Sequence, residues 1–102
     1  MGNFVIIGQA SNIGEGEMKQ VEVAGTKVAI ANVAGTFFAF GDTCTHLGCS
    51  LSEGDLEETT VTCPCHGSMF DVTSGQVLQG PAKKPEPSYS VEVRDGSLWI
   101  EV

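Results

Sequence analysis

Apolar and polar residues alternate along this chain in short stretches, and no window of about twelve residues shows the 3.6-residue apolar period of an amphipathic helix. The stretches are rich in Val, Ile, Thr and Phe and are bounded by Gly, Asn, Asp or Ser, which is typical of strands joined by tight turns. The predicted strands cover residues 4–7, 18–23, 27–33, 36–40, 59–62, 69–72, 76–78, 88–94 and 97–102. We therefore expect an all-β protein.

The turns between these stretches predict how neighbouring strands pair. Glycine-containing turns at residues 24–26 and 34–35 join three strands into a meander, and Asp95-Gly96 carries the signature of a type I′ hairpin turn near the end of the chain. Residues 80–87 hold all but one of the four prolines and cannot form a central strand, because proline has no amide hydrogen to donate. We expect that segment to be an ordered surface loop. Three aromatic residues on strand patterns are predicted core residues: Phe37, Phe40 and Trp99.

The length of 102 residues, with no internal repeat and no linker, predicts a single domain, 1–102. Residues from about 42 to 82 are expected to form a small ligand-bearing lobe, inserted into a β framework that both ends of the chain build. Residues 52–55 are predicted to form a turn within that lobe.

Thirteen acidic against five basic side chains give a net charge of -8, which argues against binding to nucleic acid or anionic membranes. A partner with a basic docking face is favoured, although acidity also serves solubility alone. No stretch approaches the roughly 18 apolar residues of a membrane span, and the N-terminus lacks the basic flank and cleavage site of a signal peptide. We expect a soluble cytoplasmic monomer without a membrane anchor.

All four cysteines and both histidines lie in two hexapeptides, CTHLGC at 44–49 and CPCHGS at 63–68. A structural zinc site normally pairs two cysteines in one knuckle with two histidines at wider spacing, and a framework of disulfides alone leaves both histidines unexplained. A thioredoxin-like dithiol needs Cys-x-x-Cys, whereas this chain has only Cys63-x-Cys65. These three interpretations remain minor alternatives. An iron-sulfur site held by two cysteines and two histidines accounts for more of the pattern.

The two hexapeptides resemble the cluster-binding loops of the Rieske iron-sulfur family, and the strand order, the spacer and the proline segment extend the likeness over most of the chain. The resemblance implies an antiparallel β-sandwich framework with an inserted lobe of two loops that carries one [2Fe-2S] cluster. The implied ligands are Cys44 and Cys63 on one iron and His46 and His66 on the other, and the implied disulfide is Cys49–Cys65. Neutral imidazoles make such a site less negative than four thiolates would, which raises its reduction potential.

Further residues near the implied cluster are expected to adjust its properties. High-potential members of the family have a serine and a tyrosine that donate hydrogen bonds toward cluster sulfurs; this chain has Ser68 and, in place of the tyrosine, Phe70. We therefore expect a reduction potential below that of respiratory Rieske proteins. Leu47 and Pro81 are expected to shield the cluster. The histidine ligands are expected to couple electron uptake to proton uptake at alkaline pH.

The resemblance implies an electron carrier and not an enzyme. We expect a Rieske ferredoxin that passes single electrons from a flavin-dependent ferredoxin reductase to a terminal oxygenase, as a dioxygenase component that serves the hydroxylation of an aromatic ring. The alternative is a Rieske subunit of a cytochrome bc-type quinol-oxidising complex, which the disulfide cysteines and Ser68 favour and the lack of an N-terminal anchor opposes. A catalytic Rieske oxygenase would need a second iron site with two more histidines, and both histidines are already used.

Overall fold

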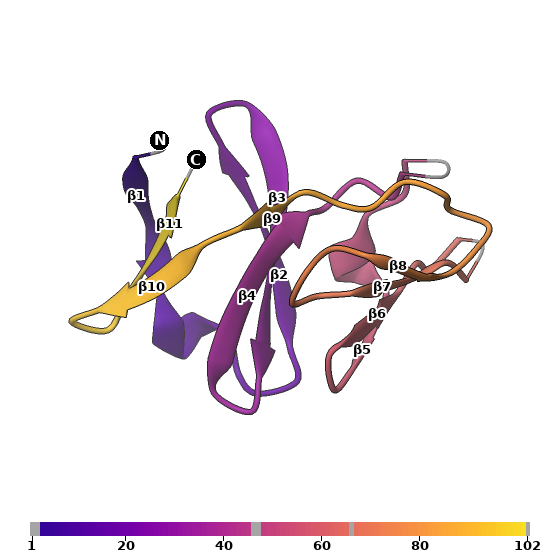
Figure 1. The fold of residues 1–102 in the computed structure, drawn as a ribbon. Helices are drawn as coiled ribbons and strands as arrows, with labels where there is room; N and C mark the ends of the chain where they lie inside the picture. The colour runs from indigo at the N-terminus through magenta and orange to yellow at the C-terminus, as the bar shows by residue number, and fades with distance from the viewer. Residues whose placement is uncertain (1–2, 46–47, 66, 102) are drawn as a thin grey trace.

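The computed structural model describes residues 3–45, 48–65 and 67–101, and the strands in this part form three antiparallel sheets (Figure 1). The strands are β1 (Phe4–Gln9), β2 (Met18–Val23), β3 (Thr26–Val33), β4 (Thr36–Gly41), β5 (Asp55–Glu57), β6 (Thr60–Thr62), β7 (Met69–Asp71), β8 (Val77–Gln79), β9 (Ser88–Tyr89), β10 (Val91–Arg94) and β11 (Ser97–Glu101). Two short 3-10 helices, η1 (Ala10–Asn12) and η2 (Leu51–Glu53), complete the elements. The expected all-β fold is confirmed.

The three sheets lie in sequence from one end of the molecule to the other (Figure 1). The terminal sheet has the order β1-β11-β10, the central sheet β2-β3-β4-β9, and the small sheet β5-β6-β7-β8. The terminal and central sheets form the framework, and the small sheet lies on the side of the central sheet away from both chain ends. Among the described residues, no helix is long and apolar enough to cross a membrane.

Strand β3 contributes to both hydrophobic cores of the protein. Successive side chains of a strand point to opposite faces, so Val28 and Ile30 pack toward the terminal sheet while Ala29 and Ala31 pack toward the small sheet. All four are fully buried. Burial of a valine or isoleucine side chain contributes about 1.5–3 kcal/mol. The central sheet is therefore covered on both faces, and the small sheet is packed against it rather than attached by a linker.

The prediction of a single strand over 88–94 is wrong, because the chain changes sheets there. Strand β9 pairs with the end of β4 in the central sheet, whereas β10 pairs with β11 in the terminal sheet. Ser90 lies between the two strands, and its carbonyl oxygen already accepts a hydrogen bond from the amide of Glu101 in β11. The predicted hairpin turn is present, since Asp95 and Gly96 both have the positive φ of a type I′ turn, 50° and 79°.

Two smaller predictions also differ from the structure. Residues 52–55 do not form one turn, because η2 ends at Glu53 and β5 begins at Asp55. Trp99 lies outside both cores, while Phe40 is buried and Phe37 packs against the framework core. The reason is strand alternation: Leu98 and Ile100 point inward, so Trp99 points outward, where the guanidinium of Arg94 lies 5.0 Å from its ring centre.

Candidate metal centre

The two hexapeptides are called the first loop (residues 44–49) and the second loop (residues 63–68), and their described residues share one backbone hydrogen-bond pattern. In the first loop the amide of Cys44 donates to the carbonyl of Cys49 at 2.8 Å, and in the second loop the amide of Cys63 donates to the carbonyl of Ser68 at 2.8 Å. The carbonyls of Cys44 and Cys63 in turn accept hydrogen bonds from the glycine amides of their own loops, at 2.9 and 3.3 Å. Each loop therefore begins with a cysteine held in the same way.

The fifth position of each loop requires glycine. Gly48 has φ 81° and Gly67 has φ 78°, a left-handed conformation that residues with a Cβ atom rarely adopt. The bases of the loops are also closed alike, the first by the isolated antiparallel bridge Thr43–Ser50 and the second by the pair Thr62–Met69 of β6 and β7. The described parts of the two loops therefore share one base and one glycine conformation.

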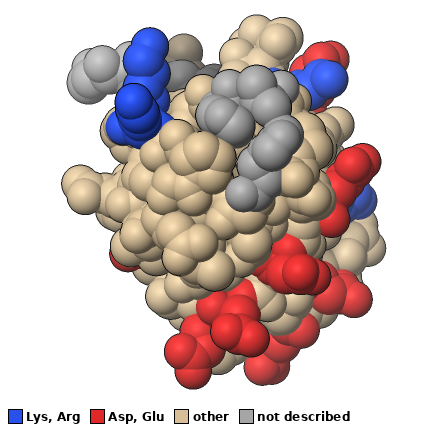
Figure 2. All heavy atoms as spheres, turned by 90° about the vertical axis from the view of Figure 1, so that its right-hand side faces the viewer, with Lys and Arg blue, Asp and Glu red and all other residues tan. Residues whose placement is uncertain are grey.

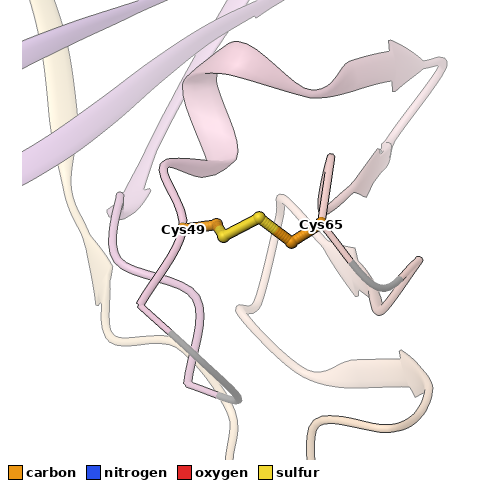
Figure 3. The surroundings of a disulfide bond; sticks show 2 residues. All are labelled: Cys49 and Cys65. Atoms are coloured by element: carbon orange, nitrogen blue, oxygen red, sulfur yellow. A yellow bond between two sulfur atoms is a disulfide. The ribbon is translucent and has the colours of Figure 1, made fainter.

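A disulfide bond between Cys49 and Cys65 joins the two loops (Figure 3). The two Cα atoms are 6.4 Å apart. Cys44 and Cys63 take no part in a disulfide bond and are buried, with 3% of each residue exposed. The sulfur atoms of Cys49, Cys63 and Cys65 all lie within 4.8 Å of one another, but two of them are bonded to each other, so Cys63 is the member of this group that retains a thiol.

The two buried cysteines outside the disulfide bond, Cys44 and Cys63, are the candidate thiolate ligands of a metal centre. Cys44 and Cys63 occupy equivalent positions of matching loops, and both belong to the core between the central sheet and the small sheet. A buried thiolate needs nearby positive charge, which a ferric ion supplies. The other residues assigned to this site from sequence, His46, His66 and Leu47, lie outside the described residues.

Asp42 anchors the base of the first loop and was missed by the sequence analysis. Its carboxylate accepts hydrogen bonds from the side chains of Gln20 and Ser50 and from the amide of Ser52, the last at 2.8 Å. Burial alone would raise the pKa of Asp42, but the hydrogen bonds from Ser50, Gln20 and Ser52 outweigh burial and lower it. The only sequence signal was the position of this residue, two residues after the predicted strand 36–40. Asp42 ties β2, β4 and the end of the first loop together.

The proline loop (residues 80–87) contacts both cysteine-bearing loops. The amide of Ala82 donates to the hydroxyl oxygen of Ser68 at 3.0 Å, and the hydroxyl of Thr45 donates to the carbonyl of Lys84 at 2.7 Å. The segment forms no strand, and Gly80–Pro81 is a cis peptide bond. Pro81 is exposed and lines an open hollow beside Thr45. The proline loop therefore closes one side of the candidate site.

Phe70 and Ser68 lie close to the base of the second loop and are buried, with 0% and 1% exposed. Phe70 packs in the same core as Cys44 and Cys63. The hydroxyl oxygen of Ser68 acts as acceptor for Ala82, so its own hydrogen is available to a further acceptor. This is the arrangement that a serine donating toward a cluster requires.

Glu86 is a second residue that the sequence analysis missed, because a glutamate between two prolines in a surface loop gives no sign of burial. It has 4% of its surface exposed. Burial raises the pKa of Glu86 to about 7, the amide of Thr45 opposes the rise by donating to the carboxylate, and the charge of Asp42 adds to it. A titratable carboxyl group thus lies beneath the first loop.

The chain matches the Rieske [2Fe-2S] domain over residues 3–91. It is 37% identical over 93 residues to the 3-phenylpropionate/cinnamic acid dioxygenase ferredoxin subunit of Escherichia coli (strain K12), covering 90% of this chain and 87% of that protein. Among solved structures, the Sphingomonas yanoikuyae B1 ferredoxin superposes with a TM-score of 0.92 at 30% identity, covering 98% of this chain and 99% of that one. A chain in the complex of reduced oxygenase and oxidised ferredoxin of carbazole 1,9a-dioxygenase superposes with a TM-score of 0.91 at 33% identity, covering 96% and 92%.

These matches extend over nearly the whole chain and agree with the paired loops, the joining disulfide and the two buried thiols. The cofactor of this chain is one Rieske-type [2Fe-2S] cluster, and the chain is an electron-transfer protein, not an enzyme. The chain belongs to the Rieske [2Fe-2S] domain family.

Proposed function

We propose that Cys44 and Cys63 hold one iron of the cluster and that His46 and His66 hold the other. The equivalent positions of the two buried cysteines in matching loops support the first pair. The position of each histidine, inside a hexapeptide that begins with one of these cysteines, supports the second. When bound, the cluster accepts and returns one electron. The protein residues fix the two loops, exclude water from the thiolates and set how readily the electron is held.

The proposed role is to carry single electrons from a flavin-dependent ferredoxin reductase to a terminal oxygenase that hydroxylates an aromatic ring. Two comparisons support the oxygenase partner: the curated relative is a ferredoxin subunit of an aromatic-acid dioxygenase, and the structural neighbour was determined in complex with an oxygenase. The reductase follows from the need of such a carrier for a source of single electrons. We further propose that the protein works as a monomer in the cytoplasm.

The observation that carries this proposal is the placement of the two joined loops at one end of the molecule, opposite both chain ends (Figure 1). Electron transfer between proteins needs a short distance between centres, so a carrier benefits from a cluster near its surface. Figure 2 shows this end with acidic side chains gathered over its lower part and a group of basic side chains at its upper left edge. Exposed acids on η2, on β5 and just after it are Glu53, Asp55, Glu57 and Glu58. An uneven charge distribution of this kind orients a docking partner.

The assignment of the two cysteine ligands is tested by metal analysis of three variants. Cys44→Ser and Cys63→Ser are expected to lose iron and acid-labile sulfide, while the double variant Cys49→Ser/Cys65→Ser, which changes the same residue type, is expected to retain both. Retention of the cluster in Cys44→Ser or Cys63→Ser, or the finding of one zinc ion and no sulfide in the wild type, would refute the assignment.

The role is tested by electron delivery. The reduced protein, mixed with a purified aromatic-ring-hydroxylating oxygenase and its substrate, is expected to be reoxidised in step with product formation. Direct voltammetry supplies the contrast: a reduction potential near the upper end of the class range of about -150 to +300 mV would favour quinol oxidation instead. Failure of every such oxygenase to reoxidise the protein would contradict the proposed partner.

A further inference from the structure

Glu86 is the one acidic residue of the proline loop, and its buried carboxyl group has few partners. Only 4% of the residue is exposed, and its Oε2 atom has no hydrogen-bond partner among the described residues. A buried polar atom without a partner costs free energy, and a charged one costs more. Such a group calls for an explanation, and a redox-linked role is one kind of explanation.

Backbone contacts determine where this carboxyl group lies. The amide of Glu86 donates to the carbonyl of Gly75 at 2.7 Å, and the amide of Gly41 donates to the carbonyl of Pro87 at 2.9 Å. A Cβ atom on Gly75 would lie 2.0 Å from the carbonyl oxygen of Glu86, and one on Gly41 would lie 2.6 Å from its Oε1 atom. Because neither glycine has a side chain, the proline loop can pass close to the backbone at both positions. The carboxyl group is fixed beneath the first loop and not free to turn toward solvent.

Glu86 is connected to the first loop through Thr45, which lies between the proposed ligands Cys44 and His46. The amide of Thr45 donates to the Glu86 carboxylate, and its hydroxyl donates to the carbonyl of Lys84 at 2.7 Å. Two residues of the proline loop thus hold one residue of the first loop. A change in the charge of Glu86 therefore acts directly on the first loop, which carries two of the proposed cluster ligands.

The charged groups near Glu86 do not stabilise its carboxylate form, so its protonation can respond to a further charge. From the end of β4, Asp42 contributes a like charge. On the proline loop itself, Lys83 and Lys84 are exposed, and within the described part of the chain neither forms an ion pair with Glu86. No described cation therefore holds the carboxylate in its charged form. With burial raising its pKa to about 7, the group is half-protonated near neutral pH.

We propose that Glu86 is a redox-linked proton-binding residue, which takes up one proton from solvent when the cluster takes up one electron and releases it when the electron leaves. The inference rests on the ligand assignment proposed above. The step is balanced, because one electron enters the cluster, one proton forms the O–H bond of the carboxyl group, and the total charge of the site stays constant. The added negative charge of the reduced cluster favours protonation of a nearby carboxylate, and the protonated carboxyl group in turn favours the electron.

The test is the reduction potential as a function of pH, measured by voltammetry from about pH 5.5 to about pH 8.5, on either side of the Glu86 pKa. The wild-type potential is expected to fall as the pH rises through neutrality. If reduction raises the proton affinity of Glu86 tenfold, the total fall is 59 mV. Glu86→Gln keeps the size and one acceptor oxygen for the Thr45 amide but binds no proton, so its potential is expected to stay at the acid-limit value of the wild type through neutrality, up to the alkaline pH at which the histidine ligands titrate.

Glu57→Gln is the matched control, because it removes the same charge from an exposed position of the small sheet. It is expected to keep the wild-type slope. A wild-type potential that is flat across this range, or a slope that persists unchanged in Glu86→Gln, would overturn the proposal. The cluster absorbance of the same samples tests the ligand assignment separately: a coloured protein with a flat potential refutes Glu86 alone, whereas a colourless wild type refutes both.

A second readout requires no variant and no partner protein. The reduced-minus-oxidised infrared difference spectrum at neutral pH is expected to show the C=O band of a carboxylic acid gained on reduction, shifted when the protein carries ¹³C-labelled glutamate. If Glu86→Gln does not fold, this labelled wild-type spectrum decides the matter. Absence of a glutamate band from the difference spectrum would overturn the proposal.

Discussion

The hydroxyl oxygen of Ser68 accepts a 3.0 Å hydrogen bond from the amide of Ala82, so the second loop and the proline loop meet at a buried serine. Both residues are almost fully buried, with 1% and 4% exposed. In this bond Ser68 acts only as an acceptor, so its hydroxyl hydrogen can still be donated to another acceptor. We propose that this side chain links the position of the proline loop to the electrostatics of the cluster.

Ser68→Ala is expected to lower the reduction potential. A hydrogen bond to a charged group contributes roughly 1.5–3 kcal/mol, and a one-electron couple shifts by 59 mV for each tenfold change, so the fall amounts to several tens of mV or more. Voltammetry of the variant measures it. Ser90→Ala, at the exposed break between β9 and β10, is the control and is expected to leave the potential unchanged. An unchanged potential in Ser68→Ala would show that its hydroxyl does not reach the cluster.

Phe70→Tyr is expected to raise the reduction potential by supplying a donor that this chain lacks. Phe70 is fully buried in the core that also contains Cys44 and Cys63, so a hydroxyl placed on its ring lies in a region without water. The expected rise is again of the order of several tens of mV, for the same reason as at Ser68. Phe38→Tyr, on a ring that packs at the edge of the same core, is the control. A potential that does not move would contradict the assignment of position 70.

Asp42→Asn is expected to destabilise the first loop. The carboxylate accepts bonds from Gln20, Ser50 and Ser52, and an amide can present only one oxygen to these donors. The loss at neutral pH is expected to be about 1.5–3 kcal/mol, the range for a hydrogen bond to a charged group. Thermal unfolding at pH 7 measures it, with exposed Asp55→Asn as the control. A melting temperature equal to that of the wild type would show that the network contributes little.

Glu86→Gln is expected to be more stable than the wild type at alkaline pH, and the reason is linkage. The pKa of Glu86 is raised from 4.5 to about 7 on folding, so between these values the folded protein binds more protons than the unfolded chain, and wild-type stability falls as the pH rises. At 1.36 kcal/mol per unit, the total cost is about 3 kcal/mol above pH 7.

Melting temperatures of Glu86→Gln and of the wild type, compared at intervals from about pH 5 to about pH 8, should diverge as the pH rises. A constant difference between the two proteins over this range would show that Glu86 does not titrate there. This measurement concerns folding alone and is independent of the redox coupling proposed above.

The sequence was sufficient to predict the features that depend on local residues. The meander, the type I′ turn at Asp95-Gly96 and the lack of strand in the proline loop follow from turn chemistry and from the missing amide of proline. The two matching loops could be anticipated because each hexapeptide carries its own cysteine and glycine. In each case, the information lies within a few residues of the feature.

The features that escaped prediction depend on residues far apart in the chain. Asp42 is recognisable as an anchor only when Gln20 and Ser50 are seen beside it, and Glu86 is buried only because Gly41 and Gly75 let the proline loop pass closely. The split between β9 and β10 has the same origin, because it depends on which sheet each half of the segment meets. The sequence showed that Trp99 and its neighbours Leu98 and Ile100 point to opposite faces of a strand. Which of these faces is covered by the rest of the protein could be learned only from the structure.

Strand β3 lies in the middle of the protein with a core on either side, and this position governs how the protein comes apart. Neither the framework nor the cluster-bearing end can open without uncovering one face of the same strand. The amide hydrogens of β3 should therefore exchange with solvent more slowly than those of any other strand, in step with global unfolding. The cluster-bearing end and the framework therefore unfold cooperatively, so local fluctuations at the docking surface do not release the cluster.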